Sequence, residues 1–61
     1  MRPTILLTGA RGQLGTALAV ALVPHGEVVA TDRSTLDLAD ASAVADAVRR
    51  VRPALIVNAG A

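Results

Sequence analysis

Three short apolar runs alternate along this chain with two longer segments whose apolar residues recur every three or four positions. The runs span Thr4–Thr8, Glu27–Thr31 and Ala54–Asn58, and their centres are apolar without alternation. Uninterrupted apolar runs of this length are typical of parallel strands that are covered on both faces of a sheet. The pattern therefore predicts three buried parallel strands.

The first periodic segment predicts a helix that begins near Gly12 or Gln13 and ends before Pro24. We expect Gly26 to close this end as a left-handed C-terminal cap. Helical spacing at i, i+4, i+7 and i+8 defines its expected apolar stripe. The stripe consists of Leu14, Ala17, Leu18, Ala21 and Leu22.

The second periodic segment predicts a helix that runs from an N-cap at Asp40 to about Arg52, where Pro53 stops it. Asp46 lies three and four residues before Arg49 and Arg50, so it can pair with either. The expected inner face of this helix is Val44, Ala47, Val48 and Val51.

Alternating strands and helices indicate an α/β fold with a parallel sheet. If the second and third strands step outward in the same direction from the first, right-handed crossovers place both helices on one face. The other face and the outer edge of the first strand would then be uncovered. We therefore expect residues 1–61 to be part of a larger protein, and not to form a stable monomer alone.

Three glycines, Gly9, Gly12 and Gly15, follow the first strand directly and open the first helix. One glycine can turn the chain sharply, one can let backbone approach a pyrophosphate, and one can let helix and strand pack closely. The phosphates would meet the free N–H groups at the helix N-terminus. This context predicts a dinucleotide site.

An acidic residue is expected about 20 residues after such glycines, at the end of the second strand. Asp32 directly follows Thr31 and can accept a hydrogen bond from the ribose 2′-hydroxyl of NAD. Arg11 and Arg33 could instead bind the 2′-phosphate of NADP, so both cofactors remain open. The sequence predicts the N-terminal β-α-β-α-β portion of a Rossmann-type doubly wound parallel sheet, within an NAD(P)-binding domain whose remainder and substrate domain are absent.

Composition excludes several other classes of function. The 61 residues contain no Phe, Tyr or Trp and no cysteine. The absence of cysteine excludes zinc or redox chemistry through thiols. The arginine cluster Arg49, Arg50 and Arg52 lacks aromatic neighbours, which gives nucleic-acid binding little support. No apolar run approaches the roughly 20 residues of a membrane span. We expect a cytoplasmic protein without a membrane or nucleic-acid partner.

Other polar residues have simpler interpretations. His25 lies in a helix-ending turn without a nearby Asp or Ser, so we expect a surface histidine. Asp40 is interpreted as a cap and Asp46 as a surface ion-pair partner, so no metal site is predicted.

Four stretches, 6–15, 31–33, 36–38 and 52–59, follow one another at the spacing of a known family. In them the chain resembles the dTDP-4-dehydrorhamnose reductases, which are extended short-chain dehydrogenases/reductases, and the similarity covers essentially its whole length. The family usually has Asn-Ala-Ala where this chain has Asn58-Ala59-Gly60, and Asn-Ala-Gly is found in neighbouring short-chain reductases. Arg11 resembles an arginine of the GDP-fucose synthase loop, which favours NADPH.

The resemblance implies specific contacts with the cofactor. Residues 12–14 would lie along the pyrophosphate, Asp32 would meet the adenosine ribose, and Asp37 and Leu38 would flank the adenine. Gly60 and Ala61 would line the cofactor beside the third strand. With the residues inferred above, the candidate cofactor-binding set is Gly9, Arg11, Gly12, Gln13, Leu14, Gly15, Asp32, Arg33, Asp37, Leu38, Gly60 and Ala61.

The resemblance also implies what this chain does not contain. Hydride transfer in the family uses a Tyr-x-x-x-Lys pair, and this sequence has neither Tyr nor Lys, so no catalytic residue is assigned. The implied parent protein uses NADPH or NADH to reduce dTDP-4-dehydro-L-rhamnose, and its magnesium-linked homodimer contact lies outside this chain. Alternatives are a sugar-nucleotide epimerase, a GDP-fucose synthase-like enzyme, a non-catalytic regulatory subunit such as that of methionine adenosyltransferase, or a truncated reading frame.

Overall fold

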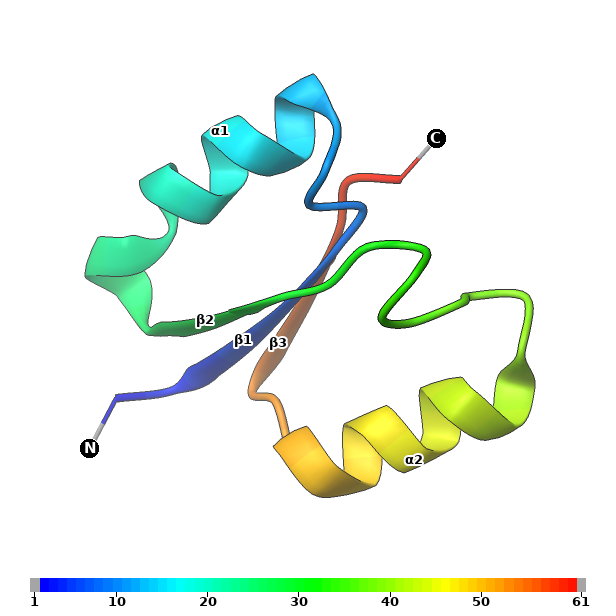
Figure 1. Cartoon of the computed structure of the whole chain (residues 1–61). Coiled ribbons are helices and arrows are strands. Elements are labelled where there is room, and N and C mark those ends of the chain that lie inside the picture. The colour runs from blue at the N-terminus through cyan, green and yellow to red at the C-terminus, as the bar shows by residue number, and fades with distance from the viewer. Residues whose placement is uncertain (1, 61) are drawn as a thin grey trace.

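Three parallel strands and two helices alternate along residues 2–60, the part of the chain that the computed structural model describes (Figure 1). A single 3-10 turn, η1, follows the first helix. The elements are β1 Thr4–Thr8, α1 Gln13–Ala21, η1 Val23–His25, β2 Glu27–Ala30, α2 Ala41–Val51 and β3 Leu55–Asn58. The predicted α/β class and the order of the elements are confirmed.

The strand order is β2-β1-β3, so β1 is the central strand and pairs in parallel with both neighbours. The expectation that the second and third strands lie on the same side of the first is therefore wrong. The connection from β2 through α2 crosses β1 in the opposite direction to the connection through α1. Right-handed crossovers in opposite directions place their helices on opposite faces, and Figure 1 shows α1 and α2 on the two sides of the sheet.

The core is concentrated on the central strand. Ile5, Leu6 and Leu7 of β1 are only 2%, 2% and 0% exposed, whereas Leu55 and Ile56 of β3 are 50% and 53% exposed. Successive side chains of a strand point to opposite faces, so neither face of β3 is fully covered by the described residues. The predicted burial of all three strands on both faces holds for β1 alone.

Helix α1 packs on the sheet through a face that agrees only in part with the predicted stripe. Its buried or half-buried positions, together with the residue that follows it, are Gly15, Leu18, Ala19 and Leu22, at i, i+3, i+4 and i+7. Of the predicted stripe, Leu18 and Leu22 are half-buried and are confirmed, whereas Leu14, Ala17 and Ala21 are exposed and were wrongly included. The prediction followed the positions of the leucines, whereas Gly15 makes the closest approach to the end of β1.

Helix α2 agrees with its prediction in both its cap and its inner face. The N–H of Ala43 donates to Asp40 Oδ1 at 3.1 Å, and Arg49 pairs with Asp46 at 2.8 Å. Ala47 is buried, and Val44, Val48 and Val51 are half-buried. None of the helices within residues 2–60 is long and apolar enough to cross a membrane.

The segments that follow the two helices depart from prediction. Gly26 has a φ of 167° and a ψ of −173°, an extended conformation, so it is not a left-handed cap. It is buried, and a Cβ there would collide with the carbonyl oxygen of Pro3, which explains the glycine by close approach instead. The left-handed residue is Arg52, which ends α2 with a φ of 49° and donates its N–H to Val48 O at 2.8 Å.

Candidate functional site

The carboxyl ends of the three parallel strands meet at one edge of the sheet, where the first glycine turn lies. Gly9 follows β1 with a φ of 71°, in the left-handed region that favours glycine. A Cβ at this position would collide with Gly60 N and lie 2.7 Å from Gly60 Cα. Gly9 therefore brings the turn after β1 into backbone contact with the segment that follows β3.

Gly15 has a packing role within the same loop. A Cβ on Gly15 would collide with the carbonyl oxygen of Gly9 and lie 2.6 Å from Ala10 Cα. This glycine lets the first turn of α1 lie directly against the end of β1. Its role is the close helix–strand packing expected of one glycine of the three.

Gly12 has neither of these reasons to be glycine. Its φ of −73° and ψ of 175° are open to any residue, and the nearest atom to a Cβ there is Gly9 O at 4.0 Å. A side chain at this position would extend into open space above the turn. Neither the backbone conformation nor the packing of the described residues accounts for a glycine here.

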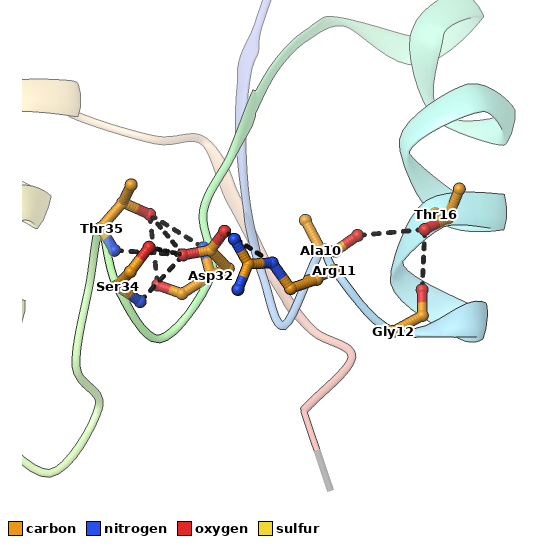
Figure 2. Close-up of polar contacts among 7 residues, drawn as sticks. All are labelled: Ala10, Arg11, Gly12, Thr16, Asp32, Ser34 and Thr35. Atoms are coloured by element: carbon orange, nitrogen blue, oxygen red, sulfur yellow. Dashed lines mark hydrogen bonds and ion pairs between the residues drawn. The ribbon is translucent and has the colours of Figure 1, made fainter.

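The N-terminus of α1 opens on this same space. Gly12 is the N-cap and provides no side-chain cap, and no acidic residue lies in the first turn. The N–H groups of the first turn have no acceptor within the helix, and they carry the positive end of the helix dipole. The Thr16 hydroxyl donates to Gly12 O at 2.8 Å and has Ala10 O as a second acceptor at 3.3 Å, which ties the helix to the turn (Figure 2).

Asp32 lies across from this turn, at the end of β2. Its Oδ1 accepts hydrogen bonds from Ser34 N at 2.8 Å, Ser34 Oγ at 2.6 Å and Thr35 N at 3.2 Å. Its Oδ2 lies 3.6 Å from Arg11 Nε (Figure 2). The hydrogen bonds from Ser34, followed by that from Thr35 and the charge of Arg11, lower the pKa of the Asp32 carboxyl below its ordinary value.

The two oxygens of Asp32 are therefore in different situations. Oδ1 stabilises the turn formed by residues 32–35, which is the ordinary loop role of an aspartate after a strand. Oδ2 faces the guanidinium of Arg11, whose side chain is 80% exposed. Only Oδ2 remains available to a molecule bound between the two segments.

Two adjoining hollows, of about 290 and 340 Å³, lie between these segments, and we call them together the glycine cleft. They share Gly9, Asp32, Arg33 and Gly60. The smaller hollow is also lined by Leu36 and Leu38, and the larger by Arg11, Gly12, Gln13, Leu14 and Ala59. The N-terminus of α1 thus borders the larger hollow, two leucines border the smaller one, and the charged Asp32 and Arg33 border both.

Most of the described candidate residues line this cleft, and two do not. Gly15 lies beneath the turn, and Asp37 uses its Oδ1 to accept the N–H of Ala39 at 2.9 Å. Ala61 lies outside the described residues. Leu36 and Ala59 line the cleft although the prediction omitted them; their adjacency to Asp37 and Gly60 was the available clue.

A separate hollow of about 470 Å³ lies between residues 35–36 and α2, away from the glycine turn. Asp46 and Arg49 form part of its wall and are paired with each other. Across residues 2–60, no three His, Asp or Glu side chains gather closely enough to hold a metal ion. The glycine cleft is therefore the main candidate site.

Comparison with known proteins relates the whole chain to one family. The family model for the RmlD substrate binding domain matches residues 1–61. A dTDP-4-dehydrorhamnose reductase of Streptomyces griseus is 46% identical over 61 residues, covering 98% of this chain and 20% of the relative. The enzyme of the same name from Aggregatibacter actinomycetemcomitans is 44% identical over 59 residues, covering 93% and 20%.

A solved structure is similar over the full length of the chain. The crystal structure of dTDP-4-dehydrorhamnose reductase from Bacillus anthracis str. Ames, in complex with NADP, superposes with a TM-score of 0.93 at 34% identity. The superposition covers 100% of this chain and 22% of that one. This chain spans about a fifth of the length of the curated relatives it matches.

Proposed function

We propose, since the chain belongs to the family of the RmlD substrate binding domain, that residues 1–61 form the cofactor-binding part of a sugar-nucleotide reductase. The reaction proposed for the longer protein is the reduction of dTDP-4-dehydro-L-rhamnose to dTDP-L-rhamnose with NADPH or NADH. The relatives at 44–46% identity are named for this reduction.

The observation that carries the proposal is the open space at Gly12. Apart from the adjoining residues of the chain, the nearest atom to a Cβ there is Gly9 O at 4.0 Å, so this position leaves room for a ligand that must approach the backbone. The adjacent helix N-terminus presents unpaired N–H groups and no acidic side chain, which suits an anion. A pyrophosphate lying over Gly12, Gln13 and Leu14 accounts for both features.

The far end of the cleft suits the adenosine half of the cofactor. The apolar side chains of Leu36 and Leu38 offer a surface for adenine, and Asp32 Oδ2 can accept a hydrogen bond from a ribose hydroxyl. Arg11 and Arg33 can pair with a 2′-phosphate. We propose that the cleft accepts both dinucleotides, with Arg11 turning from Asp32 toward the 2′-phosphate when NADPH binds. NADP in the Bacillus anthracis neighbour supports this assignment.

The bound dinucleotide supplies the hydride, and this chain holds and orients it. The glycine turn positions the pyrophosphate, while the carboxyl ends of β1 and β3 form the floor of the cleft at Gly9 and Gly60. The sequence has no Tyr and no Lys. We propose that the general acid which protonates the sugar oxygen comes from the remainder of a protein about five times as long.

The domain assignment is part of the same proposal. Leu55 and Ile56 are 50% and 53% exposed although they occupy neighbouring positions on a strand. A strand with apolar side chains exposed on both faces is an aggregation hazard in a soluble protein. We propose that the remainder of the cofactor domain covers both faces of β3, so that residues 1–61 are one part of that domain.

The direct test uses the purified full-length protein and separates binding from turnover. NADPH and NADH are titrated by fluorescence, and their oxidation at 340 nm is followed after dTDP-4-dehydro-L-rhamnose is added. Binding with oxidation supports the reductase. Binding without oxidation points to a non-catalytic nucleotide-binding subunit, and absence of binding contradicts the cofactor site itself.

A further inference from the structure

The side chain of Asn58 joins two segments at the floor of the glycine cleft. Asn58 ends β3 and is the register partner of Thr8, which ends β1. Its Oδ1 accepts hydrogen bonds from Thr8 Oγ1 and from Gly60 N, both at 2.9 Å. Because a backbone N–H can only donate, the atom facing Gly60 must be the oxygen, and the Thr8 hydroxyl must donate to it. One acceptor thus holds the end of β1 and the turn after β3 together.

The bond to Gly60 N fixes the closest backbone contact in the cleft. Gly60 lies so near Gly9 that a Cβ on Gly9 would collide with Gly60 N and come within 2.7 Å of Gly60 Cα. Both glycines line both hollows of the cleft. The position of Gly60 therefore sets the width of the cleft beside the glycine turn.

The sheet itself does not depend on this side chain. Ala59 N donates to Thr8 O at 2.9 Å and Ala54 N donates to Thr4 O at 2.8 Å, so backbone bonds hold β3 against β1 at both ends. Losing the Asn58 side chain would free Gly60 N and leave the buried Thr8 hydroxyl without its acceptor. Removing the Asn58 side chain would therefore loosen the turn after β3, while the register of β3 against β1 would stay the same.

We propose that Asn58 is a positioning residue: its side-chain oxygen holds Gly60 against Gly9 and so sets the cleft for the dinucleotide. It acts through the Gly60 backbone, without requiring contact with the cofactor. This role rests on the proposed function of the cleft. It also gives Asn58, which was not among the candidate cofactor-binding residues, a definite role.

The experiment compares Asn58→Ala with Thr8→Val in the full-length protein. Thr8→Val removes one donor but leaves the bond between Asn58 and Gly60, so it is the matched control. Amide hydrogen exchange of Gly60 and Ala59 is measured by NMR, and the Kd for NADPH by fluorescence titration. In Asn58→Ala we expect faster exchange at Gly60, unchanged protection at Ala59, and a Kd raised roughly tenfold, the equivalent of one hydrogen bond.

In Thr8→Val, Gly60 should stay protected and the Kd should change by no more than about twofold, even if the melting temperature falls. A freed Gly60 amide with an unchanged Kd in Asn58→Ala would overturn the positioning role. Equal losses of affinity in both variants would do the same, because they would follow stability instead. Should Asn58→Ala not fold, Asn58→Ser shortens the side chain and takes the same measurements. If the wild type binds neither dinucleotide, the proposed function itself fails.

Discussion

The substitution Gly12→Val tests whether glycine is needed at this position for binding the cofactor or for folding. The backbone at Gly12 is extended, with a φ of −73°, and apart from the adjoining residues the nearest atom to a Cβ there is Gly9 O at 4.0 Å. The folded chain can therefore accommodate valine without a clash. Glycine is a better N-cap than valine, so we expect a loss of about 1 kcal/mol of stability.

Binding should respond far more strongly than stability. A valine side chain at Gly12 would fill the space through which a pyrophosphate reaches the N–H groups of Gln13 and Leu14. A hydrogen bond to a charged group contributes about 1.5–3 kcal/mol. Losing two of them weakens binding at least about 100-fold.

The assay is a fluorescence titration of NADPH on the full-length protein, paired with a thermal melt of each variant. Gly15→Ala is the matched control, because its Cβ would collide with Gly9 O and lie 2.6 Å from Ala10 Cα. We expect Gly15→Ala to lower the melting temperature strongly, and Gly12→Val to weaken NADPH binding at least about 100-fold with only a small fall in melting temperature. Tight NADPH binding by a folded Gly12→Val protein would refute the reasoning.

Four further predictions follow, of which two concern Asp32, one Arg52 and one the isolated chain. Asp32→Ala should raise the Kd for NADH roughly 10- to 100-fold and that for NADPH less; equal losses in titrations of both would show that Asp32 does not distinguish them. The folded state lowers the pKa of Asp32 from about 3.8. The stability that the Asp32 carboxylate contributes is therefore present above that pH and is lost as the pH falls through the lower folded value. Amide exchange of Ser34 and Thr35, measured over a pH series, should show the turn intact at pH 5–8. Arg52→Gly should relieve the left-handed φ of 49° and stabilise the full-length protein by about 0.5–1 kcal/mol, and a melting temperature that falls would contradict this. Residues 1–61 alone should sediment as associating species without a cooperative melt, whereas a cooperatively melting monomer would contradict the domain assignment.

Local signals in the sequence were sufficient for the elements and for most of the cleft. Apolar runs, the Asp40 cap and Pro53 placed the elements to within one or two residues, because each depends on a few neighbouring side chains. The glycine spacing and Asp32 likewise gave the two walls of the cleft. These features are fixed by local chain chemistry.

What the sequence did not determine depends on distant contacts. The order β2-β1-β3 follows from which strand β3 pairs with, and both orders satisfy the right-handed crossover rule. The inner face of α1 was predicted only in part, because Leu14 was placed on it whereas Gly15 makes the close approach to Gly9 and Ala10. Asn58 bonds to Thr8, which lies 50 positions away in the sequence, and to Gly60, which lies two positions away. No spacing rule links Asn58 with Thr8.

The most direct test of the central claim is a crystal structure of the full-length protein with NADPH bound. The account predicts pyrophosphate oxygens within hydrogen-bonding distance of the backbone N–H groups of Gln13 and Leu14, above Gly12. It also predicts adenosine beside Asp32, Leu36 and Leu38. A dinucleotide bound elsewhere, or one whose pyrophosphate makes no contact with the first turn of α1, would contradict it.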